Sequence, residues 1–355
     1  MQRRCVRQAL QWSALCAAVV ALSLVFEQLG VPAAELFAGL ISATLLALAR
    51  FAPDAFPWIV PRSSQAILGV LIGTKLNITI LDSAKHSAVP IVLIVASTLV
   101  FTLGAGLLLG MRKDVSPVTG ILSLAPGGAS SVTAISHELG GDSRSVAVLQ
   151  FLRLGIVTMA MPVVVLWLSD GPLVADRAPE TNQPWFIDLA FVGVCAVLGA
   201  PLGRLLRLPA GALLGPMLVS AAAAVIPVPW VAPPPTVLTG IAFAVIGSQA
   251  GLRFTPKSLK ELARMLPLAL TLIIVIIVVC AGLGLVLAKV MGISPLEGYL
   301  ATTPGGIYAV LAFAVASHVD VTFVTTVQVL RVFAMLLVLP AIASAISKFR
   351  ERRSR

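Results

Sequence analysis

Long apolar runs separated by short polar stretches fill almost the whole chain. The longer runs reach the ~20 apolar residues that a membrane-spanning helix needs. In the first half the runs cover about 11–30, 34–50, 64–80, 88–110, 117–137 and 144–168, and in the second half about 185–206, 210–226, 236–252, 265–290, 295–317 and 320–346. The pattern predicts an all-α integral membrane protein, with 11–30 as its first spanning helix rather than a cleaved signal peptide.

The second half of the chain repeats the first at an offset of 178 residues. Residues 116–162 align without gaps on 294–340, and 15 of these 47 positions are identical. Polar residues, glycines and prolines are among the matches, which a shared apolar bias would not produce. The matches include Pro117/Pro295, Gly120/Gly298, Asp142/Asp320, Gln150/Gln328, Arg153/Arg331 and Pro162/Pro340. The sequence therefore predicts two tandem homologous membrane repeats.

The same offset extends toward the N-terminus. It pairs Leu68-Gly69 with Ile246-Gly247 and Gly73 with Gly251, and with one residue of slippage Pro32-Ala33 matches Pro209-Ala210. We therefore divide the chain into a first membrane repeat, an extracytoplasmic linker, a second membrane repeat and a basic cytoplasmic tail. These are residues 1–168, 169–184, 185–346 and 347–355.

Charge is sparse and unevenly placed. Charged residues make up 11% of the 355 positions, the mean hydropathy is +1.01, and the net charge of +10 is concentrated near both ends. A soluble protein carries about 25% charged residues. No soluble stretch is long enough to form a nucleic-acid-binding module, so the basic ends are interpreted as anchors on an anionic membrane surface. The lipid bilayer is the expected partner and nucleic acid is not.

The distribution of basic residues predicts the orientation. The linker holds Asp170, Asp176 and Glu180 against Arg177, so we place it outside, whereas 253–264 holds four basic residues and belongs inside with both termini. Each repeat then crosses an odd number of times, and the two are inverted. Five crossings per repeat plus a broken or re-entrant segment give about ten transmembrane helices in a bacterial-type inner membrane. Parallel repeats with six crossings each are the alternative.

A Pro-Gly-Gly interrupts the fifth apolar run of each repeat. These residues are Pro126, Gly127 and Gly128 in the first copy and Pro304, Gly305 and Gly306 in the second. Proline removes a backbone donor, and the freed polar groups are tolerated in a membrane only when they are buried in protein or line a wet cavity. Inverted repeats with a broken helix in each half are typical of secondary transporters. A proline kink that serves packing alone is the alternative.

An Asp, a Gln and an Arg recur on the last helix of each repeat, as Asp142, Gln150 and Arg153 and again as Asp320, Gln328 and Arg331. Asp142 suits an N-cap, and the offsets of 8 and 11 residues keep all three near one helical face. Eleven residues place Arg153 about 16 Å along the helix, near mid-bilayer, where a charge usually faces a protein interior or a cavity. The arginines are interpreted either as ligands of an anionic substrate or as donors to carbonyls freed at the adjacent break.

No metal, cofactor or catalytic constellation is predicted. The chain has three histidines, His86, His137 and His318, and no HExxH, Walker or dinucleotide motif. His137, Glu138 and His318 have no counterpart in the other repeat, so we expect them to be loop residues rather than ligands.

The segment PAGALLGPM at 209–217, the segment APGGASSVTAISHELGGD at 125–142 and the doubled Q-x-x-R helix resemble the AbrB-type family of duplicated membrane proteins. The resemblance covers nearly the whole chain, although the first copy departs from PAGALLGPM at 33–39. Members of that family are labelled either AbrB-family regulators or ammonia monooxygenases. By analogy, the layout is similar to that of cation–proton antiporters and anion transporters.

These observations predict a secondary transporter of a small solute or ion, with an anion as one candidate. Its substrate-binding residues would be the two Pro-Gly-Gly segments and the two Asp, Gln and Arg sets. A membrane protein that regulates gene expression without binding DNA is the alternative. Ammonia monooxygenase activity is disfavoured, because copper and iron sites need several His or carboxylate ligands.

Overall fold

A computed structural model describes most of the chain, and every regular element in the described part is a helix. The described residues are 2–29, 31, 33–53, 55–75, 88–112, 115–126, 132–133, 136, 139–168, 185–206, 208, 210–225, 231–254, 256 and 265–353. The predicted all-α class is therefore confirmed for these residues. The linker at 169–184, Gly127, Gly128, His86, His137 and Glu138 lie outside them.

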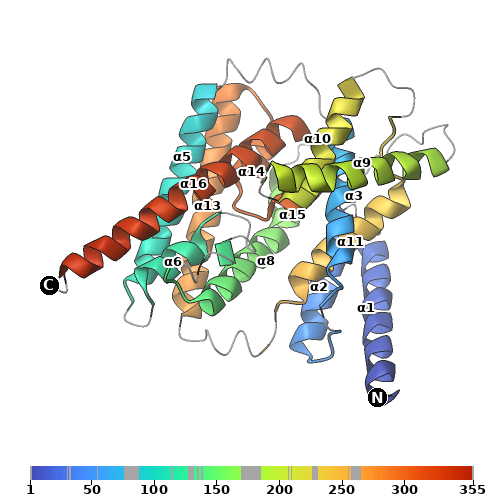
Figure 1. Ribbon diagram of the computed structural model, residues 1–355, viewed down its shortest axis with the longest axis horizontal. Coiled ribbons are helices and arrows are strands. Elements are labelled where there is room, and N and C mark those ends of the chain that lie inside the picture. Colours follow the sequence, from blue (N-terminus) through green and yellow to red (C-terminus); the bar gives the residue numbers. More distant parts are fainter. Residues whose placement is uncertain are drawn as a thin grey trace. The chain divides into compact units, whose positions relative to one another are not determined.

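The helices follow the apolar runs closely (Figure 1). In the first half they are α1 (Gln2–Gln28), α2 (Ala34–Leu48), α3 (Ile59–Lys75), α5 (Ala88–Gly110), α6 (Pro117–Leu124) and α8 (Ser143–Leu168). In the second half they are α9 (Trp185–Leu205), α10 (Gly211–Val225), α11 (Thr236–Gly251), α13 (Leu266–Met291), α14 (Pro295–Thr302), α15 (Ile307–Ala316) and α16 (Val321–Arg353). The largest differences from the prediction are at the two ends, where α1 begins nine residues earlier and α16 runs on through residues 347–353.

Within the described residues, six helices are long and apolar enough to cross a membrane, namely α1, α5, α8, α9, α13 and α16. This supports a membrane-embedded protein. The apolar helices α2, α10, α11 and α15 are shorter. A 15-residue helix is only about 22 Å long, less than the ~30 Å hydrocarbon core, so α2 and α10 need their flanking residues to complete a crossing.

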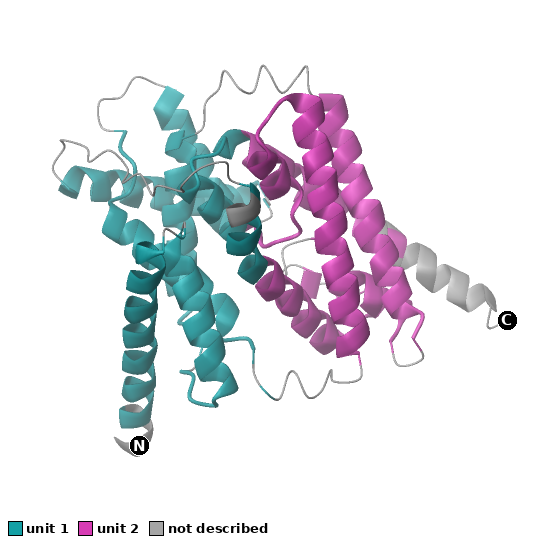
Figure 2. Ribbon diagram, turned by 180° about the vertical axis from the view of Figure 1, so that it is seen from behind, with its two compact units in different colours: residues 1–82, 158–256, 308–322 teal, residues 83–157, 257–307, 323–355 magenta. Residues whose placement is uncertain are grey.

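The chain forms two compact units, and each takes equivalent helices from both halves of the sequence (Figure 2). Unit 1 consists of residues 1–82, 158–256 and 308–322, and unit 2 of residues 83–157, 257–307 and 323–355. Thus α1, α2 and α3 share unit 1 with their counterparts α9, α10 and α11. In unit 2, α5, α6 and the first part of α8 lie with α13, α14 and α16.

In unit 1, glycines bring helices of opposite halves into backbone contact. A Cβ on Gly69 of α3 would lie 2.2 Å from the Leu213 carbonyl oxygen of α10, and one on Gly247 of α11 would lie 2.0 Å from the Leu36 oxygen of α2. One turn later, Gly73 meets Met217 and Gly251 meets Leu40 in the same way. Residue numbers rise together along each pair, so α3 runs parallel to α10 and α2 runs parallel to α11.

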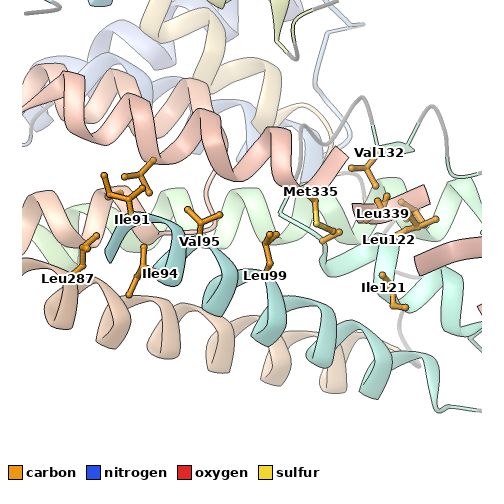
Figure 3. Close-up of a cluster of buried hydrophobic side chains, with 14 of the residues drawn as sticks. Ile91, Ile94, Val95, Leu99, Ile121, Leu122, Val132, Leu287, Met335 and Leu339 are labelled. Carbon is orange, nitrogen blue, oxygen red and sulfur yellow. The ribbon is translucent and has the colours of Figure 1, made fainter. Parts of the chain in front are cut away.

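In unit 2, α5 and α13 pack side by side in opposite directions (Figures 1 and 3). Leu287, near the end of α13, lies beside Ile91 and Ile94, near the start of α5, in one buried apolar cluster (Figure 3). The neighbouring short helices cross them at glycine pairs. A Cβ on Gly120 of α6 would lie 2.4 Å from the Gly106 oxygen of α5, and one on Gly298 of α14 would lie 2.2 Å from the Gly284 oxygen of α13.

Left-handed backbone conformations recur at matching positions of the two halves. Ala33, before α2, and Ala210, before α10, both have a φ of 53°. Gly140 has a φ of 76°, and His318, which stands 178 residues later, has a φ of 54°. Non-glycine residues rarely adopt this conformation. The turns before α8 and α16 therefore share a left-handed backbone conformation, although the residue types differ. His318 is a turn residue, as we expected.

Candidate functional site

The Pro-Gly-Gly of the second half interrupts a helix. α14 ends at Thr302 and α15 begins at Ile307, so Pro304, Gly305 and Gly306 lie between two helical segments. In the first half, α6 ends at Leu124 and the described chain continues through Pro126. Both prolines are buried. Carbonyls at the end of each short helix therefore lie where no following helical turn supplies donors.

In the first half, Gln150 and Arg153 of α8 supply donors to these carbonyls. Arg153 Nη1 donates to the carbonyl oxygens of Leu124 and Ala125 at 2.6 and 2.7 Å. Gln150 Nε2 donates to those of Leu122 and Ala125 at 2.6 and 3.0 Å. Arg153 Nη2 also donates to Gln150 Oε1 at 2.9 Å, which joins the two side chains into one unit.

The second half repeats this arrangement on α16. Arg331 Nη1 donates to the carbonyl oxygens of Thr302 and Thr303 at 2.9 and 2.8 Å, and Arg331 Nη2 donates to Gln328 Oε1 at 2.6 Å. Gln328 Nε2 donates to the oxygens of Leu300 and Thr303 at 2.7 and 3.2 Å. Every donor and acceptor of this set stands 178 residues after the equivalent atom of the first half.

Both arginines are deeply buried positive charges. Each guanidinium group belongs to a side chain that is 3% exposed, and both glutamines are fully buried. Among the residues that the structure describes, the Nε atoms of Arg153 and Arg331 have no hydrogen-bond partner. The two charges are close enough to interact electrostatically, and Cys280 of α13 lies near both. Among the described residues, Asp188 is the one buried carboxylate, and it belongs to unit 1. The described part of unit 2 therefore buries two positive charges without a buried acidic partner.

The two aspartates are each 11 residues, or about three helical turns, before the arginine of the same helix. Asp142 accepts hydrogen bonds from the backbone amides of Arg144 and Ser145 at 3.1 and 3.3 Å, so it is the N-cap of α8, as predicted. Asp320 accepts from the Thr322 amide at 2.9 Å in the same role at α16. The Ser145 hydroxyl, with the neighbouring amides and Arg144, holds the pKa of the Asp142 carboxyl below its usual value against a smaller opposing effect of burial.

The predicted site residues thus divide into two groups. Gln150, Arg153, Gln328 and Arg331 meet the ends of the short helices, whereas Asp142 and Asp320 cap helix starts. Gly127 and Gly128 lie outside the described residues. In the part of the chain that the structure describes, no group of three or more His, Cys, Asp or Glu could hold a metal ion.

Sequence reasoning did not find a second feature, a groove in unit 1 where α3, α9 and α10 meet. Arg62 and Arg204 line it, together with Trp58 and Tyr308. These residues come from α3 and the residue before it, from α9 and from α15, and they form no local motif, so only the folded structure brings them together. That they line the same groove cannot be inferred from their positions in the sequence.

Comparison with known proteins gives the family. The sequence profile of the family described as "Transition state regulatory protein AbrB" matches residues 43–347. The chain belongs to the AbrB family. Among AbrB relatives, the Escherichia coli (strain K12) protein named "Putative regulator AbrB" is 33% identical over 97% of this chain and 99% of its own length. The Bacillus subtilis (strain 168) protein "Uncharacterized protein YhjN" is 25% identical over 78% of this chain and 76% of its own. The resemblance predicted from the sequence motifs is therefore confirmed.

Proposed function

We propose that this AbrB-family protein is a secondary transporter of a small anionic solute, working by alternating access in a bacterial inner membrane. The observation that carries the proposal is the pair of buried arginines at the two helix breaks. A buried charge is costly unless a partner compensates it, and two like charges in one unit increase that cost. An anion held near both guanidinium groups would supply the missing partner.

Each arginine is proposed to do two things. Its Nη atoms fix the carbonyls at the end of a short helix, and its Nε–H and its net charge remain for an anion. Planar guanidinium groups suit this division because their donors point in fixed directions. The fixed short helices would in turn hold the Pro-Gly-Gly backbone in place as the remainder of the binding site.

The directions of the helices support inverted repeats. Consecutive spanning helices alternate in direction, so α10 and α11 run opposite to each other. Because α2 runs parallel to α11, it runs opposite to α10, its own counterpart. The counterparts α5 and α13 also run in opposite directions. If flanking residues complete the crossings of the short helices α2, α3, α10 and α11, the whole chain crosses the membrane ten times. Each repeat then has five crossings and one broken segment.

The division into two units supports alternating access. Transporters of this kind commonly move one bundle against another around a binding site. Here unit 2 carries both Gln–Arg pairs and the ends of both short helices, whereas unit 1 carries the glycine-paired helices α2, α3, α10 and α11. We therefore propose that unit 2 is the substrate-carrying part.

A transport assay tests the proposal. Purified protein in proteoliposomes would be exposed to gradients of chloride, phosphate, monocarboxylates and dicarboxylates, with sodium and potassium salts as cation controls. We expect an electrical or flux response to one anion class, lost in the Arg153→Gln, Arg331→Gln double variant when activity is scaled to folded protein. Normal activity of that well-folded variant would exclude the arginines from substrate binding.

Orientation is tested separately. In a background lacking Cys5, Cys16, Cys195 and Cys280, an Asp176→Cys variant should react with a membrane-impermeant thiol reagent in intact cells, because the acidic linker is expected outside. Protection of that cysteine from the reagent in intact cells would contradict the inverted arrangement.

Regulation of gene expression is the second candidate, suggested by the word "regulator" in the name of the Escherichia coli relative. It is distinguished by a strain in which the chromosomal gene carries the two arginine substitutions. If the protein acts by transport, this strain should reproduce the deletion phenotype. If the substituted protein instead restores wild-type transcript levels, regulation independent of transport is favoured.

A further inference from the structure

The groove in unit 1 has the chemistry of an anion site. It has a volume of about 620 Å³ and is lined by residues of α3, α9 and α10, by Trp58 before α3 and by Tyr308 of α15. Arg62 and Arg204 are its charged residues, and no carboxylate is among the described residues that line it. Ser63 and Tyr308 add hydroxyl groups. The lining therefore combines a double positive charge with neutral hydrogen-bonding groups.

The two arginines are positioned by contacts that the fold provides. The Arg62 guanidinium carbon lies 4.9 Å from the centre of the Trp58 ring, a cation–π contact that restricts where the side chain points. Arg204 follows Gly203, whose Cβ, if present, would lie 2.3 Å from the Gly211 oxygen. This close crossing places the end of α9, and with it Arg204, against the start of α10.

The start of α10 adds to the positive potential. Ala210, Gly211 and Ala212 all line the groove, and the first hydrogen bonds of α10 run from Leu213 and Leu214 to the Ala210 oxygen. The first amides of a helix have no acceptor within it and carry the positive end of its dipole. Two guanidinium groups beside such a terminus suit a phosphate group, since arginine binds phosphate oxygens in a bidentate manner.

The rim of the groove is apolar and exposed. Trp58 is 67% exposed and Val197 is 72% exposed, and both line the groove. On a membrane-embedded chain such side chains face lipid, and tryptophan favours the level of the headgroups. A ligand with a phosphate beside an acyl chain would match both parts of this surface, whereas free phosphate would match only the charged part.

We propose that this groove binds the phosphate headgroup of an anionic phospholipid, with Arg62 and Arg204 on the phosphate and the acyl chain along Val197. In the topology proposed above, the start of α3, the end of α9 and the start of α10 all lie on the cytoplasmic side. The inner leaflet there supplies anionic lipid, and basic pockets between membrane helices are known lipid sites. The groove's chemistry itself does not depend on transport or on the arginine pair of unit 2.

Lipid-dependent thermal stability of the full-length protein in detergent tests this proposal. Phosphatidylglycerol is titrated against wild type, an Arg62→Gln, Arg204→Gln double variant and an Arg50→Gln control, which removes one exposed arginine outside the groove. We expect phosphatidylglycerol to raise the Tm of wild type and of the control with the same half-saturating concentration. The double variant should need at least about tenfold more lipid, because it loses two charge-assisted contacts.

The remaining arms identify the source of the phosphate. Phosphatidylcholine, which carries no net charge, should give no saturable shift, and inorganic phosphate should not displace phosphatidylglycerol. Displacement by inorganic phosphate would assign the site to soluble phosphate instead. Equal responses of wild type and the double variant to phosphatidylglycerol, or equal responses to both lipids, would overturn the proposal.

Folding of the variant is checked in the same experiment. If the Gln variant is not monodisperse without added lipid, the Arg62→Lys, Arg204→Lys variant replaces it. Lysine keeps the charge but loses the bidentate geometry. We therefore expect the lysine variant to bind phosphatidylglycerol more weakly than wild type but still measurably. A lysine variant that responds equally to phosphatidylglycerol and phosphatidylcholine would refute a headgroup site, and one with the wild-type half-saturating concentration of phosphatidylglycerol would refute bidentate arginine contacts. The transport assay is not a readout here, so failure of this proposal is distinguishable from failure of the proposed function.

Discussion

Replacing Arg331 with Gln should destabilise the protein by removing donors from the end of α14. The Thr302 carbonyl loses its bond to Arg331 Nη1, and Gln328 Oε1 loses its bond to Arg331 Nη2. The Thr303 carbonyl keeps Gln328 Nε2 as a donor at 3.2 Å. Two buried acceptors are thus left without this partner, and each costs about 1–3 kcal/mol.

The sum of about 2–6 kcal/mol is an upper range, because the variant also removes a buried charge and its desolvation cost. At roughly 2 °C per kcal/mol for a chain of this size, the Tm should fall by on the order of 4–12 °C. The Tm of Arg331→Lys should lie between those of wild type and Arg331→Gln, since an ammonium group reaches fewer of these acceptors. Thermal unfolding in a fixed detergent, followed by tryptophan fluorescence or size exclusion, measures the shift.

Lys289→Gln is the matched control, because Lys289 is an exposed cation near the end of α13 in the same unit. Its loss should leave the Tm within about 1 °C, as surface substitutions usually do. If Arg331→Gln unfolds at the temperature of wild type, the arginine does not hold the α14 carbonyls and the reasoning from these contacts is wrong. The Arg153→Gln variant should behave like Arg331→Gln, because its contacts are equivalent.

Further predictions concern packing, capping and metal content. Gly247→Ala places a Cβ 2.0 Å from a backbone oxygen of α2 and should cost about 1–3 kcal/mol, whereas Gly282→Ala, with nothing within 4 Å, should leave the Tm unchanged or raise it. Asp142→Ala should cost about 1 kcal/mol and Asp142→Asn much less, in thermal unfolding at pH 7. The pKa of Asp142 is lower in the folded than in the unfolded protein, so its negative charge stabilises the fold at pH values above the unfolded pKa. This stabilisation is lost as the pH falls through the folded pKa. In strong acid the Asn variant should therefore be as stable as wild type. Metal analysis of purified protein should find no stoichiometric copper or iron; one tightly held metal per chain, lost on mutating His137 and His318, would contradict this.

The sequence predicted the helices well because a lipid bilayer allows few backbone structures. Backbone groups in a bilayer must be satisfied internally, so an apolar run of sufficient length becomes a helix, and runs such as 88–110 and 185–206 match α5 and α9 almost to the residue. The helix interruption at Pro304 was also readable, since proline and glycine disrupt helices wherever they occur. The start of α1 was misjudged because Gln2–Leu10 is polar yet rich in good helix formers.

The site was only partly predictable. Spacing alone placed Gln150 and Arg153 on one helical face, and the offset of 178 identified their counterparts. It could not decide between binding a substrate and holding carbonyls, because the acceptors at Leu124 and Ala125 are backbone atoms without a sequence signature. The pairing of α2 with α11 and of α3 with α10 was equally hidden, since a glycine in a sequence does not name the helix that it contacts.

The pairing of helices across the two halves has a consequence for synthesis in the cell. α2 begins at Ala34 and its partner α11 begins at Thr236, about 200 residues later. At about 5–20 residues per second, a ribosome needs roughly 10–40 s to produce that partner. During this interval the nascent first half has inserted helices whose glycine faces are open to lipid and to proteases. Truncation after the first half should therefore yield a rapidly degraded fragment, and co-expression of the separate second half should rescue it.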